Sequence, residues 1–275
     1  MSGQIAKLHR MFEAENQDSY TGNKIIAFTS GKGGTGKTFL SVNIAHCLAH
    51  RGYKILFIDF DSNLSNANVL LNINPQKTII DYFLGKVLFD NIITPGAGNI
   101  DYIFGDSGRL DYPKITVDQI SRFLTQLHKA SKNYDYIFID TGAGINNEII
   151  YLLGKMHKNI FVTTPEPTSI IDSYAVIKML HSKSRAVKNS VIINTCENKQ
   201  QADEAFENMR IALSHFLKIS IDYLGFVQFD QSVRKSVIDQ NLFVSTFPKS
   251  SITSQIISIS EKLSGIEQLA NIHHS

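Results

Sequence analysis

Glycine and lysine are concentrated in one short stretch of the sequence, "SGKGGTGKT" at residues 30–38. The pattern G-x-x-x-x-G-K-[ST] is met by Gly31, Gly36, Lys37 and Thr38, and it is typical of a loop that binds nucleotide phosphates. Glycines allow successive backbone N–H groups to turn inward around an anion. The lysine contacts β- and γ-phosphate oxygens, and the threonine hydroxyl is a ligand for Mg²⁺. The predicted nucleotide-binding residues of this loop are Gly31, Lys32, Gly33, Gly34, Thr35, Gly36, Lys37, Thr38 and Phe39.

Carboxylates follow two other apolar segments. The run "YIFID" ends at Asp140, where a carboxylate can hold Mg²⁺ through water, and Gly142 in the following "TGAG" can bring an N–H to the γ-phosphate. Asp59 and Asp61 follow "KILFI". Asp61 is a candidate for orienting the attacking water, because hydrolysis of a phosphoanhydride depends on positioning more than on covalent chemistry. We therefore predict Lys37 and Asp61 as catalytic residues, and Thr38, Asp59 and Asp140 as metal ligands.

The elements that must position these residues alternate along the chain. Seven apolar, β-branched and aromatic runs are nearly continuous rather than alternating, which is typical of strands covered on both faces. They lie at 24–30, 53–59, 100–105, 134–140, 159–164, 190–195 and 222–227, with helix-like stretches at 38–52, 116–132, 168–182 and 200–218. This order predicts an α/β fold with a doubly wound, mostly parallel sheet, whose ligands bind at the carboxyl ends of the strands.

Length and composition limit the remaining classes. A chain of 275 residues with 43% hydrophobic and 19% charged residues predicts one globular domain, and a net charge of +2 gives no reason to expect nucleic acid as a partner. The apolar runs are far shorter than a membrane span, and the amino terminus lacks the apolar region of a secretory signal, so we expect a cytoplasmic protein. Cys47 and Cys196 are expected to be reduced packing residues.

The segment "KGGTGKT" resembles the deviant Walker A motif of the ParA/MinD ATPases, and the resemblance extends over about residues 22 to 264. It implies that the protein binds and hydrolyses ATP with Mg²⁺, slowly and only as an ATP-dependent homodimer. In that reading Lys32 is the signature lysine, which reaches the phosphates of the partner subunit as an arginine finger does. Asp61 corresponds to the switch I aspartate and 140–144 to switch II. Asn194 corresponds to the residue that reads adenine, for which an amide offers a donor and an acceptor.

Within this family the sequence is most similar to the FlhG group, also called YlxH or FleN. The similarity is carried by "DTGAGI" at 140–145, by the segment 229–251, and by about twenty residues before the first strand. It implies control of flagellar number or placement through an FlhF-type GTPase and flagellar basal-body or C-ring proteins. Division-site placement of the MinD type remains an alternative, and so does DNA partition of the ParA type, for which 178–188 is the best basic cluster.

The two ends of the chain flank the predicted ATPase domain at 23–264. In the extension 1–22, Ile5, Leu8 and Phe12 are spaced as in a short amphipathic helix, and a frayed tail is the alternative. FlhG proteins carry here an element that stimulates FlhF, of which this chain keeps Gln4 and Leu8. At the other end, apolar residues at helical spacing predict that 250–264 packs on the sheet. The tail 265–275 is a candidate for peripheral membrane contact.

Overall fold

The computed structural model describes residues 24–61, 66–106, 115–144, 146–184 and 187–265. The predictions for 1–22, and those for the carboxyl-terminal tail after Gly265, fall outside these ranges. Within them, no helix combines the length and the apolar character that crossing a membrane would require.

One eight-stranded sheet forms the centre of the molecule, with the strand order β3-β4-β2-β5-β1-β6-β7-β8. Neighbouring strands are parallel except for β3, which pairs antiparallel with β4. The strands are β1 (Lys24–Thr29), β2 (Ile55–Phe60), β3 (Thr94–Pro95), β4 (Ile100–Ile103), β5 (Tyr136–Thr141), β6 (Lys158–Thr163), β7 (Lys188–Cys196) and β8 (Asp222–Gln228). The predicted doubly wound α/β fold is therefore confirmed, and every predicted run overlaps a strand.

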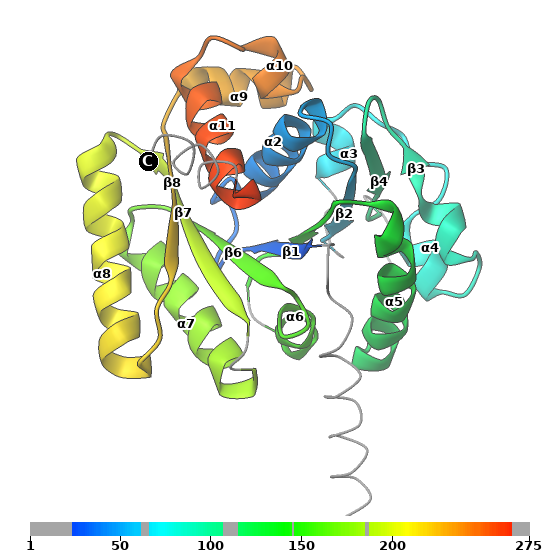
Figure 1. Cartoon of the computed structure of the whole chain (residues 1–275), viewed down its shortest axis with the longest axis horizontal. Helices are drawn as coiled ribbons and strands as arrows, with labels where there is room; N and C mark the ends of the chain where they lie inside the picture. The colour runs from blue at the N-terminus through cyan, green and yellow to red at the C-terminus, as the bar shows by residue number, and fades with distance from the viewer. Residues whose placement is uncertain (1–23, 62–65, 107–114, 145, 185–186, 266–275) are drawn as a thin grey trace, which may run out of the picture.

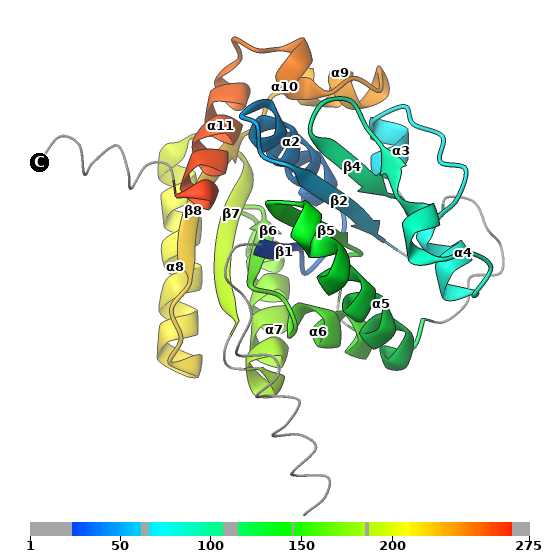
Figure 2. The ribbon, with the colours of Figure 1, turned by 45° about the vertical axis from the view of Figure 1, so that its right-hand side comes forward.

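Helices cover both faces of this sheet (Figures 1 and 2). One hydrophobic core lies under α4, η1, α5, α6, α7 and α8, and the other lies under α2, α3, α10 and α11. The α-helices are α2 (Lys37–His50), α3 (Ala67–Leu70), α4 (Ile79–Phe83), α5 (Val117–Ala130), α6 (Asn147–Leu153), α7 (Pro167–Lys183), α8 (Lys199–Leu217), α9 (Gln231–Ile238), α10 (Phe243–Thr246) and α11 (Ser251–Ser264). Two 3₁₀ turns are also present: η1 (Phe89–Ile92) precedes β3, and η2 (Ser131–Asn133) precedes β5.

The buried strands explain why the sequence reads as continuous apolar runs. All six residues of β2 and all six of β5 are buried, because each strand has helices above and below it. The final helix α11 packs on β8 and α2 through Ile252, Ile256 and Ile259, the arrangement that the sequence favours for 250–264. Both cysteines are free and buried, as predicted, and Cys196 is the last residue of β7.

The three central strands bring the candidate residues to one edge. In the sheet β5 lies between β2 and β1, and Asp59 of β2 is in register with Asp140 of β5, which is in turn in register with Phe28 of β1. The loop 30–36 leaves the carboxyl end of β1, so it begins at the same level. Parallel strands thus place the glycine-rich loop and both carboxylates side by side.

Candidate nucleotide-binding site

The glycine-rich loop joins β1 to α2 and has the backbone shape of an anion cradle. Gly34 and Gly36 have φ angles of 79° and 80°, in the left-handed region that only glycine enters without strain. A Cβ on Gly33 or on Gly34 would meet no heavy atom within 4 Å, so the mouth of the loop is open. A Cβ on Gly36 would instead overlap the side-chain amide of Asn194. The loop is therefore open where phosphates would enter and closed on the protein side.

The amino end of α2 directs unpaired backbone groups at this loop. The first intrahelical bond is donated by Leu40 to Gly36, and no side chain caps the helix. The N–H groups of the first turn are consequently available to an anion, and the helix dipole favours one. The Phe39 ring packs against the Phe243 ring in the core with centroids 5.6 Å apart, so only the backbone of Phe39 can serve the predicted nucleotide site.

Lys37, Thr38 and Asp140 form a compact cluster beneath the loop. Lys37 Nζ lies 2.9 Å from Asp140 Oδ1, and Thr38 Oγ1 donates to Asp140 Oδ2 at 2.6 Å. The carboxylate is fully buried, and the lysine side chain is 8% exposed. The structure thus brings the adjacent Lys37 and Thr38 together with Asp140, which lies 103 positions after Lys37 in the sequence. The arrangement places a phosphate-binding cation next to two candidate oxygen ligands for Mg²⁺.

The residues around this cluster fit Mg²⁺ and phosphate. Magnesium is usually held by one or two protein oxygens together with phosphate oxygens and water, and Thr38 and Asp140 offer such oxygens. Within the described ranges, no group of three or more His, Cys, Asp and Glu side chains could hold a metal alone, so the nucleotide would have to complete the shell. The buried hydroxyls of Ser30 and Thr35 have no hydrogen-bond partner among the described residues, which suits a polar ligand in the loop.

Besides its predicted role as a metal ligand, Asp59 stabilises the loop that follows β2. Its Oδ1 accepts the backbone N–H of Asp61 at 3.1 Å. Its Oδ2 accepts those of Asn66 and Ala67 at 3.1 and 3.0 Å. The buried carboxylate therefore fixes both ends of the loop that follows β2. Its position opposite Asp140 also leaves it next to the metal site.

Asp61 lies over the predicted switch II glycine. A Cβ built on Gly142 would be 3.3 Å from Asp61 Oδ1, so this carboxylate is in contact range of the Gly142 backbone. The N–H of Gly144 donates to the carbonyl of Ser30 at 3.2 Å, which ties the same segment to the glycine-rich loop. Two segments predicted to act on the γ-phosphate are therefore adjacent at the mouth of the loop.

Asn194 reaches the glycine-rich loop from the end of β7. Its Nδ2 donates to the carbonyl of Thr35 at 2.8 Å, and the residue is buried. In this conformation the amide supports the loop backbone, a role that no local motif indicates. The predicted contact with adenine would use the remaining amide oxygen.

Lys32 points toward the amino end of α7. Its Nζ lies 2.5 Å from Glu166 Oε2 and 3.4 Å from Thr168 Oγ1. The hydrogen bond and the positive charge of Lys32 lower the pKa of the Glu166 carboxyl. A Cβ on Gly31 would overlap the backbone of Asp172 and Ser173, so the loop and α7 are in direct contact. This contact joins segments about 130 residues apart and is not visible in any local motif.

Comparisons with known proteins agree with this geometry. Residues 23–193 match a family model described as an AAA domain. The chain is 30% identical over 240 residues to the antiactivator FleN of Pseudomonas aeruginosa, covering 87% of this chain and 86% of that protein. It is 29% identical to the flagellum site-determining protein YlxH of Helicobacter pylori, covering 93% and 88%. The septum site-determining protein MinD of Pyrococcus horikoshii, solved with Mg-ADP, superimposes with a TM-score of 0.72 at 23% identity, covering 91% and 98%.

Proposed function

Because this chain belongs to the AAA domain family and, within it, to the ParA/MinD ATPases of the FlhG type, we propose that it is an ATP-hydrolysing dimerisation switch. The observation that carries the proposal is the cluster of Lys37, Thr38 and Asp140 beneath an open glycine-rich loop. Lys37 would neutralise the β- and γ-phosphates, and Thr38 and Asp140 would hold Mg²⁺, which supplies charge stabilisation when bound.

The second part of the proposal is that Lys32 acts on the partner subunit. In the single chain its ammonium is held by Glu166, and the two side chains are 32% and 65% exposed. Ion pairs that are this open to water contribute little to stability, so little free energy opposes the release of Lys32. A cation freed from this pair can be placed on the phosphates of a facing subunit, where developing charge binds it more strongly.

Asp61 is the proposed positioning group for the attacking water. It lies at the mouth of the loop, beside Gly142. A carboxylate there can accept a hydrogen bond from water and orient it in line with the γ-phosphate. Hydrolysis would then remove the charge that Lys32 recognises, and the dimer would separate.

We further propose that the switch controls the number or placement of flagella. Support comes from the similarity to FleN and YlxH, whose names describe an antiactivator and a flagellum site-determining protein. The output would be binding to an FlhF-type GTPase and to basal-body or C-ring proteins, with contact to the inner face of the membrane through 265–275.

Light scattering tests the dimer with two variants that act in opposite directions. Asp61→Ala should remain an ATP-bound dimer, because hydrolysis fails after Lys32 has engaged. Lys32→Ala should remain a monomer with ATP. Lys129→Ala, on the exposed side of α5, is the matched control for loss of a surface lysine and should behave as the unaltered protein. Equal ATP-dependent dimerisation of both site variants would contradict the role of Lys32 across the interface.

The flagellar role is tested by GTP hydrolysis of the FlhF-type GTPase from the same organism. We expect this protein to stimulate that hydrolysis and a variant without residues 1–20 to lose the stimulation. An unchanged GTPase rate would leave the ATP switch intact and move the assignment toward division-site or partition roles. Steeply salt-dependent DNA binding would favour partition.

A further inference from the structure

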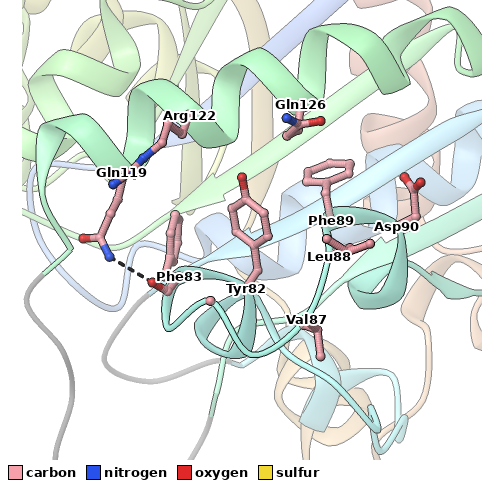
Figure 3. A pocket seen from close by; sticks show the side chains of 10 residues that line it. Tyr82, Phe83, Val87, Leu88, Phe89, Asp90, Gln119, Arg122 and Gln126 are labelled. Atoms are coloured by element: carbon pink, nitrogen blue, oxygen red, sulfur yellow. Dashed lines mark hydrogen bonds between the residues drawn. The ribbon is translucent and has the colours of Figure 1, made fainter.

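A groove lies between the α4–η1 segment and α5. It has a volume of about 470 Å³. Tyr82, Phe83 and Phe89 form its aromatic wall, and the Tyr82 ring centroid lies 5.6 Å from that of Phe83 and 5.9 Å from that of Phe89. Figure 3 shows that Gln119, Arg122 and Gln126 line the other wall along α5. A volume of this size suits one or two large apolar side chains.

Two features of the groove indicate that it receives a partner segment with both apolar and charged side chains. Leu88 at its lip is 77% exposed although it lies beside an aromatic cluster. Arg122 makes no ion pair with any residue that the structure describes, and it lies at the end of the groove opposite Asp90 (Figure 3). The groove therefore offers an apolar floor with a positive charge at one end and a negative charge at the other.

The amino-terminal segment of the same chain has the complementary pattern. Ile5, Leu8 and Phe12 repeat at intervals of 3 and 4, so they share one face when helical. Lys7 and Arg10 are basic, and Glu13 and Glu15 follow them. We propose that residues 5–15 dock as an amphipathic helix in the groove between the α4–η1 segment and α5. The basic end lies toward Asp90, and the acidic end lies toward Arg122.

The point at which the chain enters the sheet makes this docking reachable. Lys24 at the start of β1 is in register with Tyr136, which follows α5 and η2, so the segment joins the fold near the carboxyl end of α5. Arg122 lies eight residues back along α5, or about 12 Å. The residues between Glu15 and Lys24 can span about 30 Å when extended. The segment can therefore pass Arg122 and return along the groove antiparallel to α5.

The docking also has an energetic rationale. A helix of about ten residues is marginal in water, because its nucleation is costly. Burying Leu8 and Phe12 against Leu88 and Tyr82 supplies apolar contact, and the same contact covers a leucine that is otherwise exposed. The tether keeps the segment at an effective concentration near the millimolar range, so a weak contact suffices. A docked segment is unavailable to any other protein that binds it.

Disulfide trapping in the full-length chain tests the proposal. His9→Cys combined with Gln126→Cys should form an intrachain disulfide at least tenfold faster than His9→Cys combined with Asn208→Cys on the exposed face of α8, because bridging requires Cα atoms within about 7 Å. His9→Cys alone controls for the native cysteines, both of which are buried. Adding Arg122→Glu should slow trapping severalfold, and Glu13→Arg with Glu15→Arg should restore it.

A second readout uses the chain without new cysteines. The backbone amides of residues 82–90 should exchange hydrogen more slowly in the unaltered protein than in Leu8→Glu. Exchange in β5 should be the same in both proteins. Equal trapping rates at Gln126 and Asn208, or a disulfide between chains, would overturn the proposal. Unchanged exchange in Leu8→Glu would overturn it as well. Neither measurement needs nucleotide, so the outcome is separate from that of the ATPase proposal.

Discussion

The buried pair of Lys37 and Asp140 gives a quantitative test of how the site is built. The short side chain of Asp140 is fully buried, whereas the long side chain of Lys37 is 8% exposed. In Lys37→Met the carboxylate keeps only the Thr38 hydroxyl and cannot reach water, and removing one partner of a buried pair costs about 3–5 kcal/mol. In Asp140→Asn the ammonium can turn toward solvent, so we expect a smaller loss of about 1–2 kcal/mol.

The assay is urea unfolding of the nucleotide-free protein, followed by circular dichroism and fluorescence. A double variant, Lys37→Met with Asp140→Asn, completes the cycle. It should be more stable than the sum of the two single losses predicts, by at least about 1 kcal/mol, because no uncompensated charge remains. The reasoning would be refuted if Asp140→Asn were the more destabilising change, or if the two single losses simply added.

Of three further predictions, the first concerns a residue remote from the site and the other two concern the glycine-rich loop and Asn194. Burial lowers the pKa of His46 from 6.5 to about 4, so the unfolded chain binds the proton first as the pH falls. His46 should thus contribute a drop of about 2 kcal/mol in stability between pH 7.5 and 5 in urea titrations, and His46→Gln should reduce the pH dependence by that amount. Gly31→Ala should destabilise the protein by about 1–3 kcal/mol because α7 must move, whereas Gly33→Ala, facing open space, should stay within about 1 kcal/mol in the same assay. Asn194→Ala should weaken the preference for ATP over GTP in nucleotide competition, and an unchanged preference would limit Asn194 to supporting the loop.

Local patterns were sufficient to predict the fold and the glycine-rich loop. Continuous apolar runs identify the buried strands because helices cover both faces of the sheet. The loop is predictable because left-handed angles at Gly34 and Gly36 and an uncapped helix start are consequences of adjacent residues. The two-residue strand β3 escaped prediction, since it is too short to carry a periodicity.

Contacts between distant segments were not predictable. Nothing in the sequence links Lys32 to Glu166, which lie 134 positions apart, or Asn194 to the backbone of Thr35. Both contacts follow from the strand order, which places β6 beside β1 and β7 beside β6. The structural role of Asp59 was also not predictable, because its hydrogen bonds to Asn66 and Ala67 depend on how the loop after β2 folds back.

The central claim is that two ATP-loaded subunits together form the active site. Its most direct test is the rate of phosphate release per subunit, measured with Mg²⁺ and saturating ATP over a hundredfold range of protein concentration. We predict that the rate per subunit rises with concentration and then levels off, that chelating Mg²⁺ abolishes it, and that Lys32→Ala stays low throughout. A rate per subunit that is constant across the range, and equal in Lys32→Ala, would contradict the account.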